Sequence, residues 1–486
     1  MYAVSFYTLG CKLNQLETEA AAEAFREEGF TLIPWDGPEK PALFILNTCT
    51  VTSRAEQKAR RIIRLFLRSP CAVLVTGCYA QLEREALAAL DPAPGEADPA
   101  AALFVLPGGA KEALLDLPRY LARNAGPGPD ASPLPAALSR WFEERERAAR
   151  PPEDKAAASP PAPFRFNPRA FSFHSRAFLK IQDGCDRSCA YCRVPLARGK
   201  AASLASAEVL ARLRALEREG LAEAVLTGVS ICQYRDPADP RTNLPALLRL
   251  LLDNTRTIAL RLSSVEPEPA ICTGPASPGG DDFFAILAHP RIRNHFHLSV
   301  QSGSDRILAA MGRPYRAGDI AKTVERLRRI KGDPFLACDI ITGFPGETGE
   351  DFAETAALCG DLDFAGIHGF PYSPRPGTRA AAMADQVCRR LSGERLRTLL
   401  ELARRGRRAY VSRWLGKTVE AVAETAAVPS KSGTFPGLTD NYLRAAVTPA
   451  GNTPAPRPGS AFHCHIAGEA GRAGFDIRGA MILDCT

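Results

Sequence analysis

The chain has 486 residues, of which 45% are hydrophobic and 24% charged, a composition typical of a globular protein and not of a disordered one. Its length favours about three domains. No apolar run approaches the roughly 18 residues that a membrane-spanning helix needs, and the N-terminus lacks the basic region of a signal peptide. We therefore expect a cytoplasmic protein with no membrane partner, whose cysteines stay reduced. The net charge of +7 permits a polyanionic partner.

Predicted strands and helices alternate over residues 1–123. Apolar periodicity predicts strands at about 2–8, 43–47, 72–76 and 103–106 and helices at about 15–28, 53–68, 81–90 and 110–122. Ser53, with Glu56 three residues later, predicts the N-cap of the second helix. Because parallel strands need crossover connections, the alternation predicts an open parallel α/β domain.

Residues 124–170 interrupt this alternation. They are rich in proline and alanine, which predicts an extended, partly disordered linker. Within them, the segment LPAALSRWFEERERAAR could form a helix that docks through Trp141 and Phe142.

The alternation resumes over residues 171–411. Strands are predicted at 177–182, 223–227, 258–262, 296–300, 336–341 and 364–370, followed by a long helix at about 385–411. Six such units predict a partial (β/α)6 barrel with its active site at the carboxyl ends of the strands. Residues 412–486 instead contain short β-rich segments between Gly/Pro turns, which predicts a small β-barrel.

Two sets of three cysteines are the main chemical signal. Cys185, Cys189 and Cys192 lie in one loop, QDGCDRSCAYC, directly after a predicted strand. Thiolates are the usual ligands of iron–sulfur clusters, and a cluster with three protein ligands keeps one iron open for chemistry. The alternative, a zinc knuckle, needs a fourth ligand that does not follow nearby.

The second set is dispersed in the sequence. Cys11, Cys49 and Cys78 each follow the end of a predicted strand. Loops at the carboxyl ends of parallel strands form ligand crevices, so we expect these thiols to converge on a second cluster. Ordinary buried cysteines are the alternative. The eight other cysteines lack partner spacing and are predicted to be thiols, and Cys464 should face away from the two histidines that flank it on a strand.

The cysteine loop, with Tyr191 just before its last cysteine, resembles the radical S-adenosylmethionine superfamily, in which the open iron binds S-adenosylmethionine and its cleavage gives a 5′-deoxyadenosyl radical. Both cysteine sets together resemble the methylthiotransferases. The similar segments are TLGCKLNQLETEA, LNTCTVTSRAEQKARR, VTGCYAQ, RAFLKIQDGCDRSCAYCRVPLARG, LSSVEP, HLSVQSGSD, MGRPY, DIITGFPGET and YSPRPGT.

This resemblance implies two 4Fe–4S clusters, held by Cys11, Cys49 and Cys78 and, catalytically, by Cys185, Cys189 and Cys192. It implies that S-adenosylmethionine lies near Tyr191, Gly228, Glu266, Gln301 and Gly343. The alternative for the Gly-containing strand ends is a tight turn without a ligand. The C-terminal barrel looks like the RNA-binding TRAM domain. An electron donor such as flavodoxin or ferredoxin would supply the electron, and the auxiliary cluster would present the sulfur.

The family's branches differ in substrate. The phrase TLGCKLNQLETEA, with NTCTVT and GLTDNYLRA, is most similar to the branch that acts on N6-threonylcarbamoyladenosine at position 37 in the tRNA anticodon loop. The alternatives are the branches that modify isopentenyladenosine of tRNA or an aspartate of a ribosomal protein. A different class, a non-catalytic iron–sulfur protein that binds RNA or transfers electrons, would more often saturate its clusters with four cysteines.

Basic residues gather in two stretches, which suggests contact with a phosphate backbone. The first stretch comprises Arg54, Lys58, Arg60, Arg61, Arg64 and Arg68. The second comprises Arg389, Arg390, Arg395, Arg397, Arg404, Arg405, Arg407, Arg408 and Arg413. Solvated helix faces are the alternative for both.

Overall fold

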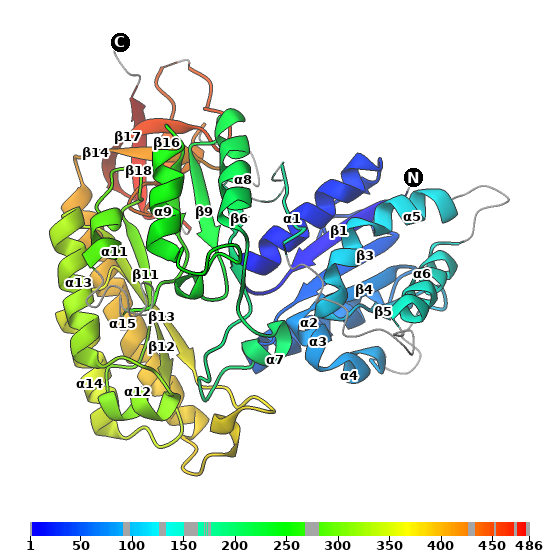
Figure 1. The fold of residues 1–486 in the computed structure, drawn as a ribbon, viewed down its shortest axis with the longest axis horizontal. Coiled ribbons are helices and arrows are strands. Elements are labelled where there is room, and N and C mark those ends of the chain that lie inside the picture. Colours follow the sequence, from blue (N-terminus) through cyan, green and yellow to red (C-terminus); the bar gives the residue numbers. More distant parts are fainter. Residues whose placement is uncertain are drawn as a thin grey trace. The chain divides into compact units, whose positions relative to one another are not determined.

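The structure is a computed structural model, and its chain divides into two compact units (Figure 1). It describes residues 2–90, 98–125, 133–149, 164–169, 171, 173, 176–267, 281–425, 433–451, 453–470 and 474–482. The first unit comprises Met1–Ser172 and the short segment Arg193–Lys200, and the second comprises Phe173–Cys192 and Ala201–Thr486.

The first unit is built on a five-stranded, all-parallel sheet with the order β2-β1-β3-β4-β5. Its strands are β1 (Ala3–Thr8), β2 (Thr31–Leu32), β3 (Leu43–Thr48), β4 (Ala72–Gly77) and β5 (Ala102–Val105). The predicted parallel α/β domain is confirmed. The two-residue edge strand β2 was not predicted, because so short a segment carries no periodicity of its own.

Helices cover both faces of this sheet. They are α1 (Lys12–Glu27), α2 (Ser53–Phe66), α3 (Cys78–Leu82), α4 (Arg84–Ala88), η1 (Gly108–Leu115), α5 (Leu117–Asn124), α6 (Leu134–Ala149) and α7 (Val194–Arg198). Alternate strand residues face opposite sides, so Leu43 and Leu74 pack in one core while Phe44 packs in the other. Phe44 stacks there on Phe66 of α2, with ring centroids 3.7 Å apart.

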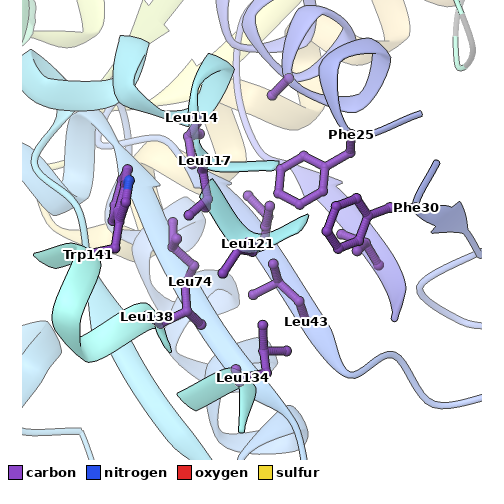
Figure 2. Packing of buried hydrophobic residues seen from close by; sticks show 14 of the residues in the cluster. Phe25, Phe30, Leu43, Leu74, Leu114, Leu117, Leu121, Leu134, Leu138 and Trp141 are labelled. Carbon is purple, nitrogen blue, oxygen red and sulfur yellow. The ribbon is translucent and has the colours of Figure 1, made fainter. Parts of the chain in front are cut away.

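Helix α6, predicted inside the proline-rich segment, belongs to the core of the first unit. Leu134, Leu138 and Trp141 pack with residues of α1, α5 and β4 (Figure 2). Phe142 stacks on Phe104 of β5 at 5.4 Å. The predicted docking through the two aromatic residues is therefore confirmed, while the predicted disorder at 126–132 and 150–163 falls outside the described residues.

The predicted cap of α2 is wrong by one residue. Thr52, with extended backbone, is the N-cap, and its hydroxyl accepts a hydrogen bond from the Ala55 N–H at 3.2 Å. Ser53 is the first helical residue, so Glu56 falls one position beyond the place that a capping box requires. Glu56 instead accepts a hydrogen bond from the Thr50 hydroxyl at 2.6 Å.

The second unit begins with the predicted half-barrel. Its strands are β6 (Ala177–Lys180), β9 (Glu223–Thr227), β10 (Ala259–Leu262), β11 (His295–Gln301), β12 (Phe335–Thr342) and β13 (Gly366–Pro371). They form the parallel sheets β6-β9-β10 and β11-β12-β13, and isolated bridges join them at Leu260–Ile292 and Val265–Leu298. The six-stranded partial barrel is confirmed.

Helices line the outer side of the half-barrel (Figure 1). They are α8 (Ser206–Arg218), α9 (Leu244–Asp253), α11 (Asp281–Leu287), α12 (Asp305–Met311), α13 (Ala317–Lys331), α14 (Gly349–Asp361) and α15 (Arg389–Trp414). Short elements complete the loops at β7 (Gln182–Asp183), β8 (Ala202–Ser203), η2 (Ile231–Gln233) and η3 (Arg379–Ala382).

The C-terminal part of this unit is a closed barrel with the order β14-β15-β16-β18-β17. Its strands are β14 (Thr418–Ala423), β15 (Phe435–Thr439), β16 (Arg444–Thr448), β17 (Ala461–Glu469) and β18 (Ile477–Ile482). The predicted small β-barrel is confirmed, and it contains one strand, β15, that was not predicted. Its core is continuous with Phe335 of β12 and Tyr410 of α15, so the barrel and the half-barrel are packed as one body.

A buried ion network reinforces this junction. Glu223, at the start of β9, accepts hydrogen bonds from Arg261 at 2.7 Å and Arg293 at 3.0 Å. Arg261 also donates to the carbonyl oxygens of Thr439 and Asp440 in the barrel, at 3.3 and 3.1 Å. A buried charge is tolerable only when it is paired and hydrogen-bonded, and here the barrel completes the pairing.

No helix among the described residues is long and apolar enough to cross a membrane. Cys232 is disulfide-bonded, so the prediction of a thiol at this position is wrong. Cys464 is fully buried while His463, next to it on β17, is exposed, as strand alternation predicts.

Candidate functional site

The three dispersed cysteines lie at one edge of the sheet in the first unit. Cys49 and Cys78 directly follow β3 and β4, and Cys11 follows β1 by three residues. These three strands are neighbours and parallel, so their carboxyl ends meet at the same edge. Cys11 is exposed, Cys78 is half-buried and Cys49 is buried. This is the juxtaposition that the strand-end positions predict.

Two glycines permit the close approach of these cysteines. Gly10 has a φ of +107°, and a Cβ atom on it would lie 2.9 Å from the Cys49 sulfur. Gly77 has a φ of +103°, and a Cβ there would lie 2.3 Å from the carbonyl oxygen of Thr48. Only glycine adopts this conformation without strain and without filling the space beside the thiols.

Buried amides fix the loops that carry the cysteines. The Asn14 side chain donates to the carbonyl oxygens of Leu9 at 2.8 Å and Thr48 at 3.0 Å. The Asn47 side chain donates in turn to the backbone oxygen of Asn14 at 2.9 Å. Because these bonds join α1 to the ends of β1 and β3, they hold two of the three cysteine loops in fixed positions.

A buried cation–carboxylate cluster lies beside this network. Arg198, in the segment that follows Cys192, donates to Asn14 Oδ1 at 2.7 Å and to Glu17 Oε1 at 3.0 Å. Lys111 also donates to Glu17, at 2.5 Å. Two cations thus face one carboxylate, which leaves positive charge near thiols that must be ionised to bind a metal.

The Cys49 thiol is difficult to ionise on its own. Its pKa is raised to about 12, mainly by burial and in part by the neighbouring Cys11 and Cys78, although the Val51 N–H and Arg198 oppose the rise. A bound metal deprotonates a coordinating thiol outright. Without a metal, this cysteine is therefore an unreactive neutral thiol near pH 7.

The second cysteine set lies in the loop after β7. The Cys185 sulfur accepts hydrogen bonds from the Arg187 N–H at 3.4 Å and from the Gln233 side chain at 3.2 Å. The Cys189 sulfur accepts one from Arg313 Nη1 at 3.2 Å. Hydrogen bonds to ligating sulfurs tune the reduction potential of an iron–sulfur cluster.

Arg313 connects this loop to a predicted cofactor residue. Its side chain is buried, and besides Cys189 it binds the carboxylate of Glu266 and donates to the Tyr315 hydroxyl at 2.6 Å. Burial alone would lower the pKa of Arg313, but the adjacent Glu266 raises it overall. Glu266 therefore lies beside the cysteine loop and its carboxylate is held by an arginine, whereas its contact with S-adenosylmethionine stays a prediction.

Two predicted glycines have close packing partners. A Cβ on Gly228 would lie 2.9 Å from Gln182 Oε1, an atom that accepts a hydrogen bond from Ser230 N–H at 2.9 Å. A Cβ on Gly343 would lie 2.6 Å from the Ser392 side chain of α15. Both glycines are thus required by packing, and their contact with S-adenosylmethionine stays a prediction.

The two other predicted cofactor residues lie at the same end of the half-barrel. Gln301 ends β11 with a φ of +71°, a strained conformation of the kind found at ligand sites. Tyr191 packs against an apolar cluster that includes Ala190, Met311 and Phe344, and burial raises its pKa. Residues from β9 to β12 therefore converge on the end of the barrel that carries the cysteine loop.

The donor sets fit iron–sulfur clusters. Each site offers three thiols, which suits a cluster with one open iron. In the first set, Gly10 leaves space beside the Cys49 sulfur that any side chain would fill. In the second set, Gln233 and Arg313 donate hydrogen bonds to the cysteine sulfurs.

Several supporting residues were not predicted as site residues. Arg313 and Tyr315 belong to the MGRPY segment, whereas Asn14, Glu17 and Arg198 belong to segments flanking the cysteines. The sequence marked these segments as similar to a family but gave no role to their polar residues. The sequence did place an asparagine and a glutamate on the apolar side of an amphipathic helix. Buried polar groups need hydrogen-bond partners, so this position could have indicated a supporting role.

Comparisons with known proteins agree with this geometry. The Radical SAM superfamily matches residues 179–359, and Uncharacterized protein family UPF0004 matches residues 3–94. The chain is 41% identical to the threonylcarbamoyladenosine tRNA methylthiotransferase MtaB of Treponema pallidum, over 94% of this chain and 96% of that protein.

More distant relatives include two kinds of enzyme. The MtaB protein of Bacillus subtilis is 32% identical over 91% of this chain and 90% of its own. The tRNA-2-methylthio-N(6)-dimethylallyladenosine synthase of Sorangium cellulosum is 32% identical over 86% of this chain and 81% of its own. The chain belongs to the methylthiotransferase family of radical S-adenosylmethionine enzymes, which use 4Fe–4S clusters and S-adenosylmethionine.

Proposed function

We propose that this chain converts N6-threonylcarbamoyladenosine at position 37 of tRNA into its 2-methylthio derivative. The observation that carries the proposal is the 41% identity, over nearly the whole of both chains, to a protein named for this activity. The presence of both cysteine sets at carboxyl strand ends supports it. The dimethylallyladenosine synthase is less similar, at 32%.

The chemistry assigns a role to each cysteine set. Carbon 2 of adenine bears an unactivated C–H bond that no side-chain acid or base removes, and the bound clusters and S-adenosylmethionine would supply radical and sulfur chemistry for it. Cys185, Cys189 and Cys192 would hold the cluster for S-adenosylmethionine cleavage. Cys11, Cys49 and Cys78 would hold the auxiliary cluster. Arg313 would orient the first site by fixing Glu266 beside Cys189.

The remaining expectations belong to the same proposal. S-adenosylmethionine would contact Tyr191, Gly228, Glu266, Gln301 and Gly343. The substrate base would be splayed from the anticodon loop, because enzymes that modify nucleobases act on unstacked bases. We further propose domain boundaries at 1–123, 124–170, 171–411 and 412–486. The electron donor would be a flavodoxin or ferredoxin, and the protein would be cytoplasmic.

A direct assay separates the possible substrates. The reconstituted protein should add a methylthio group to tRNA carrying threonylcarbamoyladenosine and act poorly on unmodified tRNA, as mass spectrometry of nucleosides would record. A site built to hydrogen-bond the threonylcarbamoyl group would leave its own polar groups unpaired with bare adenine.

The outcomes against the proposal are distinct. Methylthiolation of isopentenyladenosine, or of a ribosomal-protein aspartate, would retain the family and overturn the branch. Absence of S-adenosylmethionine cleavage under anaerobic, reducing conditions would favour a non-catalytic iron–sulfur protein.

The structure narrows the predicted phosphate contacts on α15. Arg395 is buried and bound to Glu347, Arg407 binds Asp476 at 2.8 Å and Arg413 binds Asp333 at 2.9 Å. These three arginines serve the fold, so the prediction that the whole stretch meets RNA is too broad.

The exposed arginines of α15 provide the test. Arg397, Arg404 and Arg408 share one helix face through spacings of seven and four residues. Their replacement by glutamine should weaken tRNA binding and lower the slope of log affinity against log salt by about three. Arg218→Gln, at the exposed end of α8, is the matched control. An unchanged slope in the triple variant would contradict phosphate contact by this face.

A further inference from the structure

Three polar side chains converge on the inner face of the half-barrel. His297 lies on β11, Asp339 on β12 and His368 on β13, and their ligand atoms all lie within 4.8 Å of one another. His297 Nε2 is 2.9 Å from Asp339 Oδ1, and His368 Nδ1 is 3.6 Å from the same oxygen. The cysteine sites use none of these residues.

Strand alternation explains why these side chains face inward. On β11, Phe296 and Leu298 are fully buried on the helix-covered side, whereas His297 is partly exposed on the other. Asp339 and His368 are directly paired in the β12–β13 register. The three side chains therefore share one face, and the sheet that carries them is held by regular strand pairing.

The geometry at His297 does not fit a simple hydrogen bond. Its Nε2 is buried and makes no hydrogen bond within the described part of the chain, although Asp339 Oδ1 is only 2.9 Å away. The distance is short and the direction is wrong, since a hydrogen bond needs the oxygen near the N–H axis. A short N–O distance with the oxygen off the nitrogen's axis is what two ligands of one metal ion show. When the two metal–ligand bonds are at right angles, the oxygen lies about 45° away from the nitrogen's lone-pair axis, which points at the metal.

The distances also match a metal site. With metal–ligand bonds of about 2.1 Å, ligand atoms lie about 3.0 Å apart at right angles and about 3.4 Å apart at tetrahedral angles. Two observed values, 2.9 and 3.6 Å, bracket this range, and all three ligand atoms lie within 4.8 Å of one another. His368 is 58% exposed, so its ring has room to adjust.

We propose that His297, Asp339 and His368 form a binding site for a divalent first-row transition-metal ion, separate from both cysteine sites. Imidazole nitrogens and a carboxylate suit such ions, and two histidines with one carboxylate leave coordination positions open for water or a substrate oxygen. The site does not rest on the proposed function, because it needs only the geometry of three adjacent strands.

Zinc serves as the probe. The cluster-loaded protein, dialysed against Zn²⁺ under anaerobic conditions and assayed for zinc and iron together, should take up about one zinc per chain without losing iron. Asp339→Asn and His368→Ala should bind zinc at least about tenfold more weakly. His463→Ala removes an exposed strand histidine far along the chain and should bind zinc like the parent.

X-ray absorption at the zinc edge supplies a second readout. The bound zinc should show only nitrogen and oxygen ligands, at about 2.0–2.1 Å. Sulfur ligands, or zinc uptake matched by iron loss, would mean binding at the cysteines and would overturn the proposal. Equal zinc affinity in the parent, Asp339→Asn and His368→Ala would overturn it as well. Both variants change partly exposed side chains, so retained iron content checks that they fold.

Discussion

Replacement of Cys185, Cys189 and Cys192 by alanine should abolish 5′-deoxyadenosine production. It should also remove one of two clusters, about four of about eight irons if both are four-iron cubanes. The three thiols are the only cysteines among the described residues of that loop, and two accept hydrogen bonds aimed at their sulfurs. Anaerobic iron analysis and product chromatography measure both effects.

The complementary triple variant should separate the two sites. Alanine at Cys11, Cys49 and Cys78 should remove the other cluster and abolish methylthiolation, while cleavage of S-adenosylmethionine continues without transfer. Cys388→Ala, an exposed cysteine at the start of α15, is the control and should keep both clusters. If the variant that lacks Cys185, Cys189 and Cys192 kept its full iron content and still cleaved S-adenosylmethionine, the assignment of the radical site would be wrong.

Glu223→Gln should destabilise the second unit by about 3–5 kcal/mol, because it removes the carboxylate and leaves paired arginines buried without a counter-charge. Glu223 and Arg261 are fully buried, and Arg293 nearly so. Arg261 also bonds the barrel's carbonyl groups, so the loss should loosen the barrel from the half-barrel. Thermal unfolding followed by circular dichroism measures the effect.

The control for this variant is Glu208→Gln. Glu208 pairs with Arg212 on the exposed face of α8, where one ion pair contributes at most about 1 kcal/mol. Equal unfolding temperatures for the two variants would show that the buried network contributes little.

The same residue predicts an acid dependence. Burial alone would raise the pKa of Glu223, but Arg261 and Arg293 lower it to about 2. A carboxyl whose folded pKa is depressed stabilises the fold above its unfolded pKa of about 4.3. That stability should be lost as the pH falls from about 4.3 through about 2, and Glu223→Gln should lack this component.

The core that the barrel shares with the half-barrel complicates any experiment that removes the barrel. Because the barrel shares a core with Phe335 and Tyr410, a chain cut near residue 411 would expose this core and the ion network together. Substitution of the exposed arginines of α15 therefore tests RNA binding more cleanly than truncation does.

Local patterns in the sequence predicted the fold class and grouped the six cysteines into two candidate sites. Strand–helix alternation predicted the parallel sheets of both units, and Cys49 and Cys78 could be placed at one edge because parallel strands end on the same side. Even the core helix α6 was visible through Trp141 and its amphipathic spacing. These features depend on residues that are near in sequence or on a rule that holds for every parallel sheet.

Only the tertiary structure decided which distant polar groups meet. The segment Arg193–Lys200 belongs to the first unit, where Arg198 binds Glu17. Arg313 reaches Cys189, and His297 meets Asp339 across two strands. Such partners are set by strand order, register and loop path, which leave no periodic trace in the sequence. The sequence therefore placed the cysteines, whereas the charges around them follow from packing.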